Sequence, residues 1–122
     1  MRLTRIKGKV SKGVGEGKYY VNIYSKVIER ELGWKPYPGT INIVVDKKTW
    51  ETVRKLANKD IKGFKYGEEE FHDVYYAKCV LKGVPGIIVF PTVSKHGKNI
   101  IEVILPEKIE ISAGEDVEIL VV

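Results

Sequence analysis

The sequence predicts a small α+β fold, mainly β, in which about six short strands form a barrel with one or two short helices. The chain has 122 residues, which is the size of one domain. Short runs rich in β-branched residues recur between Gly, Pro and Asp turns, a pattern typical of short strands. Two further segments favour a helix instead. We therefore expect a single domain over residues 1–122.

The expected strands follow from the residue types along the chain. Residues 3–13 alternate apolar and polar side chains, as a half-buried strand does. Residues 40–45 (TINIVV) are a β-branched run that follows a turn containing two prolines and a glycine. The chain is β-rich from residues 68–81 onward. Further strands are expected at 86–91, 99–106 and 115–122.

Two short helices are expected between these strands. Residues 25–32 (SKVIEREL) begin with Ser25, a favourable N-cap residue, and are followed by Gly33, which commonly ends helices. Residues 47–59 form the second expected helix, although its Thr and Val residues weaken the helical preference. The aromatic and β-branched residues at 18–24 are expected to be extended and to form a strand after the glycine-rich loop.

Composition and charge limit the kind of protein. With 43% hydrophobic and 30% charged residues, the chain is globular. A net charge of +5 indicates anionic partners, either nucleic acid or a small phosphorylated ligand, but the basic residues are scattered among acids. Cys79 is the one cysteine, and a lone thiol in a strand fits a reducing cytosol. No apolar run approaches the roughly 20 residues of a membrane span, so we expect a cytoplasmic protein.

The first candidate for chemistry is the glycine-rich loop GVGEGKYY, with glycines at Gly13, Gly15 and Gly17. Glycines let the backbone approach a ligand, so that successive N–H groups can hold a phosphate. The loop is not a Walker A motif, because Lys18 is followed by Tyr19. The expected strand after it also argues against a dinucleotide-binding fingerprint. The alternative is an ordinary hairpin loop.

The second candidate is the pair Thr40 and Asn42. Residues two apart on a strand point to the same face, so the hydroxyl and the amide are expected side by side. Both offer neutral oxygens, which suit Mg²⁺ where nucleotide phosphates supply the negative charge. The alternative is turn chemistry, with Thr40 satisfying backbone groups and Asn42 exposed on an edge.

The third candidate is the stretch that leads into residues 99–106. Glu102 lies within an apolar run, so it faces either solvent or a pocket. The preceding loop is rich in polar and basic residues, including Ser94 and His96. His96 and His72 have no metal-like spacing, which argues against zinc.

Together these stretches carry a resemblance to a known family. The segments GKVSKGVGEGKYY, LGWKPYPGTINI and VFPTVSKHGKNIIEVILPEKI resemble, in order and spacing, the archaeal CTP-dependent riboflavin kinases. The resemblance covers nearly the whole chain. It implies a small six-stranded cradle-loop barrel that transfers the γ-phosphoryl group of CTP to the 5′-hydroxyl of riboflavin, giving FMN and CDP. It also implies Mg²⁺ as the metal cofactor.

The resemblance also implies roles for individual residues. Thr40 and Asn42 match the Mg²⁺ ligands, and Ser94 matches a position, usually threonine, that contacts the flavin nucleotide. Glu102 matches the acid beside the phosphate-accepting end of the flavin and is the candidate catalytic residue. The family's nucleotide-binding loop corresponds to Gly13, Val14, Gly15, Glu16, Gly17 and Lys18. The segment that lines the cytidine nucleotide corresponds to Glu107, Lys108, Ile109 and Glu110.

The chain departs from the family pattern in two places. Ser94 replaces the usual threonine but keeps the hydroxyl, and the stretch between LPEKIE and GEDVEIL is shorter than in the family. We expect a monomer that binds riboflavin or FMN and CTP or CDP, with no nucleic-acid or membrane partner. The alternatives are a non-enzymatic basic β-barrel that binds nucleic acid, and a kinase for another nucleotide or another vitamin alcohol.

Overall fold

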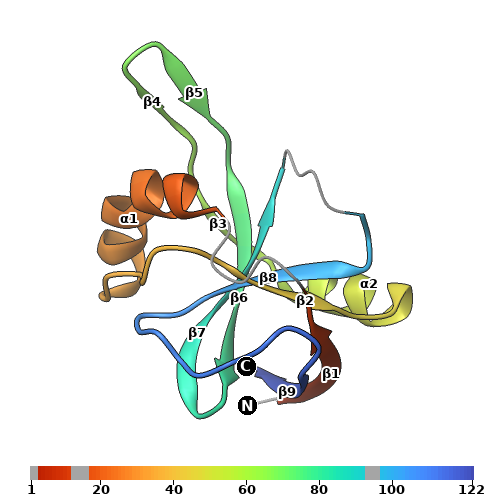
Figure 1. Ribbon diagram of the computed structural model, residues 1–122. Helices are drawn as coiled ribbons and strands as arrows, with labels where there is room; N and C mark the ends of the chain where they lie inside the picture. Colours follow the sequence, from red (N-terminus) through yellow and green to blue (C-terminus); the bar gives the residue numbers. More distant parts are fainter. Residues whose placement is uncertain (1–2, 12–16, 93–96) are drawn as a thin grey trace.

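The computed structural model describes residues 3–11, 17–92 and 97–122. Its main element is an antiparallel sheet of seven strands in the order β3-β6-β7-β8-β2-β1-β9. A further pairing between β6 and β9 closes six of these strands into a barrel, and β3 lies outside the ring beside β6 (Figure 1). The closed six-stranded barrel confirms the predicted fold class. Its strands are β1 (Thr4–Val10), β2 (Ile41–Val44), β6 (Val74–Leu81), β7 (Val84–Pro91), β8 (Ile100–Ile104) and β9 (Asp116–Val121).

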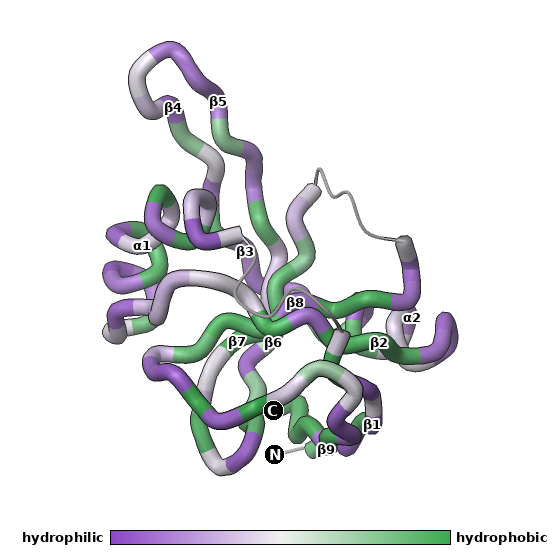
Figure 2. The backbone as a smooth tube through the Cα atoms, viewed as in Figure 1, coloured by the Kyte–Doolittle hydropathy of each residue, from purple (hydrophilic) through white to green (hydrophobic). Residues whose placement is uncertain are grey.

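Strand alternation fills the barrel with apolar side chains. One buried cluster draws Ile, Val, Leu, Ala, Phe and Cys residues from all six strands of the ring, so it occupies the interior. The hydrophobic colour in Figure 2 is accordingly concentrated along the central strands β2, β7 and β8. Residues at the alternating positions, such as Asn42 and Glu102, must then face the outside of the ring. The interior of the barrel is therefore a packed core, and a binding site can lie only on the outer face of the barrel.

Cys79, which the sequence analysis placed in a strand, is buried within this interior. Burial raises the pKa of its thiol to about 12. The side chain is consequently neutral at physiological pH and packs as a small apolar group.

The first helix is longer than predicted. Helix α1 spans Lys18–Leu32, so residues 18–24 are helical and the prediction that they form a strand is wrong. Ser25 lies within the helix and is not its N-cap, whereas Gly33 does end it, in a left-handed conformation with φ of 83°. The reason is tertiary packing. Val21 and Ile28 are buried on one helix face against the outer side of the barrel, and this burial outweighs the extended preference of the residues at 18–24.

The remaining elements are one predicted helix and three short strands. Helix α2 (Lys47–Leu56) confirms the second predicted helix, and Asp46 caps it by accepting a hydrogen bond from the Thr49 N–H at 2.7 Å. The three short strands are β3 (Lys59–Ile61), β4 (Phe64–Tyr66) and β5 (Glu69–Phe71). Strands β4 and β5 form a hairpin that projects from the barrel beyond α1 (Figure 1). Neither helix in the described ranges is long and apolar enough to cross a membrane.

The barrel interior should be the main source of stability. Leu81 is fully buried in it, whereas Leu3 is 57% exposed at the start of β1. We expect Leu81→Ala to lower the free energy of unfolding by about 2–5 kcal/mol, because it removes buried methyl groups and leaves a cavity. Leu3→Ala should change it by less than about 0.5 kcal/mol. Chemical denaturation of both variants tests this, and similar losses for the two would contradict the assignment of the core.

Candidate functional site

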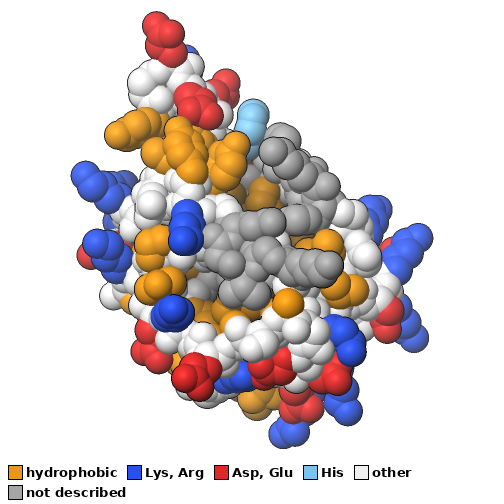
Figure 3. Space-filling view, in the orientation of Figure 1, with side chains coloured by type: hydrophobic (Ala, Val, Ile, Leu, Met, Phe, Trp, Pro, Cys, Tyr) orange, Lys and Arg blue, Asp and Glu red, His pale blue; other side chains and the backbone are white. Residues whose placement is uncertain are grey.

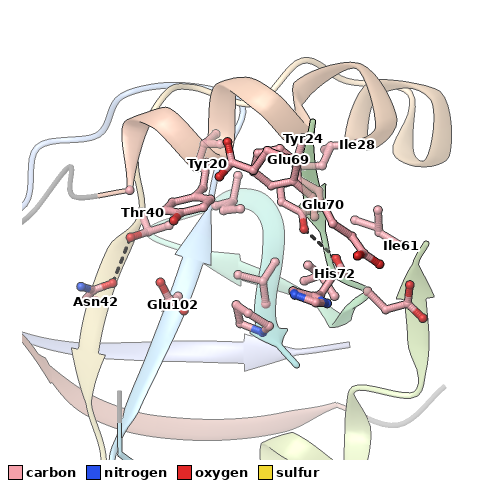
Figure 4. A pocket seen from close by; sticks show the side chains of 18 residues that line it. Tyr20, Tyr24, Ile28, Thr40, Asn42, Ile61, Glu69, Glu70, His72 and Glu102 are labelled. Atoms are coloured by element: carbon pink, nitrogen blue, oxygen red, sulfur yellow. Dashed lines mark hydrogen bonds between the residues drawn. The ribbon is translucent and has the colours of Figure 1, made fainter. Parts of the chain in front are cut away.

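A cavity of about 520 Å³ lies on the outer face of the barrel, between α1, the β4–β5 hairpin and strands β7 and β8 (Figure 4). Its floor and one wall are apolar, because the second hydrophobic cluster of the protein borders it. The apolar and aromatic lining residues are Tyr20, Val21, Tyr24, Ile28, Ile61, Phe71, Val74, Val89, Pro91 and Ile104. The polar and glycine lining residues are Gly17, Thr40, Asn42, Glu69, Glu70, His72, Asp73 and Glu102.

Thr40 and Asn42 lie together at one end of the cavity. The Thr40 hydroxyl donates a hydrogen bond to Asn42 Oδ1 at 3.0 Å, so the prediction that the two side chains share a face is confirmed. They are 6% and 2% exposed. In the ranges that the structure describes, the other buried side chains are apolar except for those of Tyr76 and Cys79. The alternative of an exposed Asn42 on an edge is wrong, because β2 lies between β1 and β8.

Glu102 lies beside this pair. In the β2–β8 ladder it is directly opposite Asn42, and directly opposite residues point to the same side of a sheet. Figure 4 shows Thr40, Asn42 and Glu102 at the same end of the cavity, with Glu70 and His72 toward the other end. Of the two expectations for Glu102, the pocket is therefore confirmed. Glu102 lies within an apolar stretch of sequence because its neighbours Ile101 and Val103 face the barrel interior, whereas Glu102 faces the cavity.

The N-terminus of α1 also borders this polar end. Gly17 has a φ of 77°, and a Cβ built on it would lie 3.6 Å from the Thr40 methyl group. The first N–H groups of a helix lack partners within the helix and carry partial positive charge, which favours an anion there. Lys18, the first residue of α1, is exposed. The strand expected after the loop is absent, because helix α1 follows it. A dinucleotide-binding fingerprint is still disfavoured, because Lys18 occupies its third glycine position and β1 and β2, which flank α1, pair antiparallel and do not form a parallel βαβ unit.

The Thr40–Asn42 pair fits a small hard cation. Neighbouring oxygens around an octahedral Mg²⁺ lie about 3 Å apart, because each is about 2.1 Å from the ion. The two side-chain oxygens are separated by that distance, and both are neutral, which leaves room for anionic phosphate ligands. No group of three His, Cys, Asp or Glu residues within the described ranges could hold a metal.

Other predicted site residues either lie outside the described ranges or do not line the cavity. Gly13, Val14, Gly15, Glu16 and Ser94 fall outside the described residues. The segment Glu107, Lys108, Ile109 and Glu110 follows β8 and does not line the cavity. Its position is fixed by the Lys82 ammonium group, which donates to the Glu110 backbone oxygen at 2.8 Å, and by packing of Ile109 against the barrel core.

The aromatic wall of the cavity was not predicted from the sequence. Tyr20, Tyr24 and Ile28 are spaced by four residues and therefore share one face of α1. That spacing was visible in the sequence, but a spacing of four places residues side by side only in a helix, and residues 18–24 were expected to form a strand. Phe71 completes the wall from the hairpin, with its ring centroid 5.9 Å from that of Tyr24. Burial and the nearby carboxylate of Asp73 raise the pKa of Tyr24, so its hydroxyl remains a hydrogen-bond donor.

These features define a small-molecule-binding barrel, with an apolar aromatic cavity and a polar end suited to a metal and an anion. Residues 10–121 match the family model CTP-dep_RFKase, described as "Domain of unknown function DUF120". The chain therefore belongs to the CTP-dependent riboflavin kinase family, which confirms the resemblance found in the sequence.

Curated relatives support the same family. A riboflavin kinase of Archaeoglobus fulgidus is 37% identical over 97% of this chain and 54% of its own length. Riboflavin kinases of Ignicoccus hospitalis and Thermococcus kodakarensis are 33% and 35% identical, over 95% and 96% of this chain. The chain spans 70% of the Ignicoccus relative and 58% of the Thermococcus relative. It therefore covers little more than half the length of the Archaeoglobus and Thermococcus relatives.

Proposed function

We propose that residues 1–122 form a single, monomeric riboflavin kinase domain, which transfers the γ-phosphoryl group of CTP to the 5′-hydroxyl of riboflavin and releases FMN and CDP. The observation that carries this proposal is the cavity, which joins an apolar aromatic part to the buried Thr40–Asn42 pair and Glu102. Membership of the family and the names of the relatives support the same reaction. The buried thiol of Cys79 suits the reducing cytoplasm in which we expect the domain to work.

The apolar part of the cavity suits the isoalloxazine ring of riboflavin. This ring is flat and largely apolar, and the cavity offers an aliphatic floor that includes Val89 and Ile104, with aromatic side chains above it. A volume of about 520 Å³ lies in the range of small-molecule sites. With the ring held there, the ribityl chain would extend toward Glu102 and bring the 5′-hydroxyl to the polar end.

The nucleotide would bind from the side of the glycine-rich loop. Backbone N–H groups of this loop, the N-terminus of α1 and the Lys18 ammonium group would hold the phosphates. The Ser94 hydroxyl would contact the flavin nucleotide, and the segment 107–110 would lie along the cytidine. The preference for CTP rests on the family, since nothing in the described residues distinguishes one base from another.

Phosphoryl transfer requires mainly positioning and electrostatic stabilisation. Thr40 and Asn42 would hold Mg²⁺, which when bound neutralises charge on the phosphates. Glu102 would orient the 5′-hydroxyl and accept its proton as the oxygen bonds to the γ-phosphorus. The bond from that phosphorus to the β,γ-bridging oxygen breaks, and CDP leaves with the electron pair.

The nucleic-acid-binding barrel is less well supported by this geometry. Four carboxylates line the cavity, from Glu69, Glu70, Asp73 and Glu102. They disfavour a polyanion that lacks a metal to offset its charge. The kinase is therefore the function that this geometry supports best.

Formation of FMN is the direct test of the reaction and of its donor. With riboflavin and Mg²⁺, we expect FMN from CTP at a rate at least about tenfold higher than from ATP, GTP or UTP, because the base must be read by the nucleotide site. Chromatography of the flavin products measures this, and EDTA serves as the control. Equal rates with all four nucleotides would refute the CTP preference, and no FMN from any of them would refute the kinase.

The metal role of the buried pair can be separated from a structural role. Asn42→Leu and Thr40→Val each remove one oxygen and keep a similar shape, so FMN formation should fall by about 100-fold or more. Riboflavin binding should remain, because the ring is held elsewhere in the cavity. The matched controls are Asn58→Leu and Thr52→Val, at exposed positions. Thermal melting measures the unfolded fraction of each variant. If activity falls only in proportion to that fraction, the pair has a structural role in the turn and does not bind the metal.

Glu102 can be tested as the group that handles the proton. Glu102→Gln keeps the shape of the side chain but removes its basicity, so kcat should fall by about 100-fold while KM for riboflavin changes little. Glu118→Gln is the control, because Glu118 is an exposed glutamate on β9. A change in KM without a change in kcat would make Glu102 a binding residue only.

A further inference from the structure

The β4–β5 hairpin forms one wall of the cavity and extends in register from the β3–β6 ladder, which ends at the pair Ile61 and Val74. Among the described residues, β4 and β5 pair only with each other, as a two-stranded sheet. Such a hairpin alone is at best marginally stable in water. Residues from Glu69 to Asp73, in β5 and directly after it, nevertheless line the cavity. The position of this wall therefore depends on the β3–β6 ladder, from which the hairpin continues, and on side-chain contacts at the base of the hairpin.

The first of these contacts comes from Tyr24 of α1. Its hydroxyl donates a hydrogen bond to the backbone oxygen of His72 at 2.6 Å. Its ring meets the rings of Phe64 and Phe71 edge to face, with centroid distances of 5.1 and 5.9 Å. Figure 3 shows hydrophobic side chains gathered at the base of the hairpin, below an acidic tip. Tyr24 thus joins α1 to both strands of the hairpin.

The second contact is made by Asp73, where the hairpin returns to the barrel. Its carboxylate oxygen accepts a hydrogen bond from the Gly63 N–H at 2.6 Å and so closes the base of the hairpin. Its backbone oxygen accepts a hydrogen bond from the Thr92 hydroxyl at 3.0 Å, at the end of β7. A Cβ on Gly63 would lie 2.4 Å from the Phe71 backbone oxygen, so the two sides of the base meet at a distance that only glycine permits.

We infer that Tyr24 and Asp73 are positioning residues that hold the β4–β5 hairpin in place as a preformed wall of the cavity. The identity of the ligand as riboflavin rests on the function proposed above. A wall that is already ordered spares the ligand the conformational entropy of ordering it, which strengthens binding without acting on the chemical step. The phosphoryl-accepting end lies against the barrel strands, away from the hairpin, and should be unaffected.

Two variants remove these contacts one at a time. Tyr24→Phe keeps the ring and loses the hydroxyl, and Asp73→Ala loses the acceptor for Gly63. We expect the Kd for riboflavin, measured by quenching of flavin fluorescence, and its KM to rise about fivefold to tenfold in each. The kcat should stay within about twofold of the original value. Asp73→Asn keeps a carbonyl oxygen as acceptor and should restore most of the affinity.

Hydrogen–deuterium exchange provides a readout that does not depend on activity. Amides of residues 62–72 should exchange faster in Tyr24→Phe and Asp73→Ala, whereas amides of the barrel strands should not change. Tyr66→Phe is a matched control on the same hairpin, because its side chain is 63% exposed. Asp116→Ala is the second control, since Asp116 is exposed and does not line the cavity.

The outcomes separate this inference from the proposed function. Unchanged exchange in residues 62–72 overturns the inference whether or not the protein makes FMN. Faster exchange throughout the barrel, with a loss of thermal stability, also overturns it, because the two residues would then support the fold as a whole. A fall in kcat at unchanged KM has the same consequence. Failure of the unmodified protein to make FMN refutes the kinase alone, and the exchange experiment then decides the role of the hairpin.

Discussion

Closure of the barrel by the β6–β9 pairing is the constraint on which the rest of the structure depends. Three residue pairs make this seam, including Cys79 with Val121 and Leu81 with Ile119. Once the ring is closed, its inward-facing residues fill a narrow interior with apolar side chains and leave no room for a ligand. Strand alternation then sends every second residue outward, so that Asn42 of β2 and Glu102 of β8 emerge on the same outer face. Closure therefore decides where a functional site can lie.

The outer face becomes a cavity because α1 covers it. Val21 and Ile28 bury their side chains against apolar residues that point outward from β6, β7 and β8. Toward its N-terminus the same helix rises over the polar end, where Gly17 passes beside Thr40. One helix thus provides both the apolar cover and an anion-favouring terminus above the buried oxygen pair. Helix α1 therefore positions both the apolar part and the anion-favouring part of the site.

Much of this was predictable from the sequence, and the exceptions have physical causes. The barrel strands follow from local β-branched runs, and the shared face of Thr40 and Asn42 follows from strand periodicity. The start of α1 was missed because residues 18–24 have weak helical preferences, and the helix is stabilised by tertiary burial of Val21. Strand β5 falls within the predicted β-rich segment 68–81, but its hairpin with β4 was missed, because β4 and β5 have three residues each and contact α1 in a way that no local pattern shows.

The cavity therefore has two parts that differ in how firmly the fold holds them. Asn42 and Glu102 lie on neighbouring barrel strands, each hydrogen-bonded on both sides in the closed ring, so their separation is fixed by the sheet. The wall formed by Phe71 and His72 lies beyond the end of the β3–β6 ladder and is held against α1 by side-chain contacts, including those of Tyr24. Positions near the reacting atoms need sub-ångström precision, whereas a flat apolar ring tolerates small shifts of its walls. The more rigid part of the fold carries the residues to which we assign the chemistry, and the hairpin contributes mainly to binding.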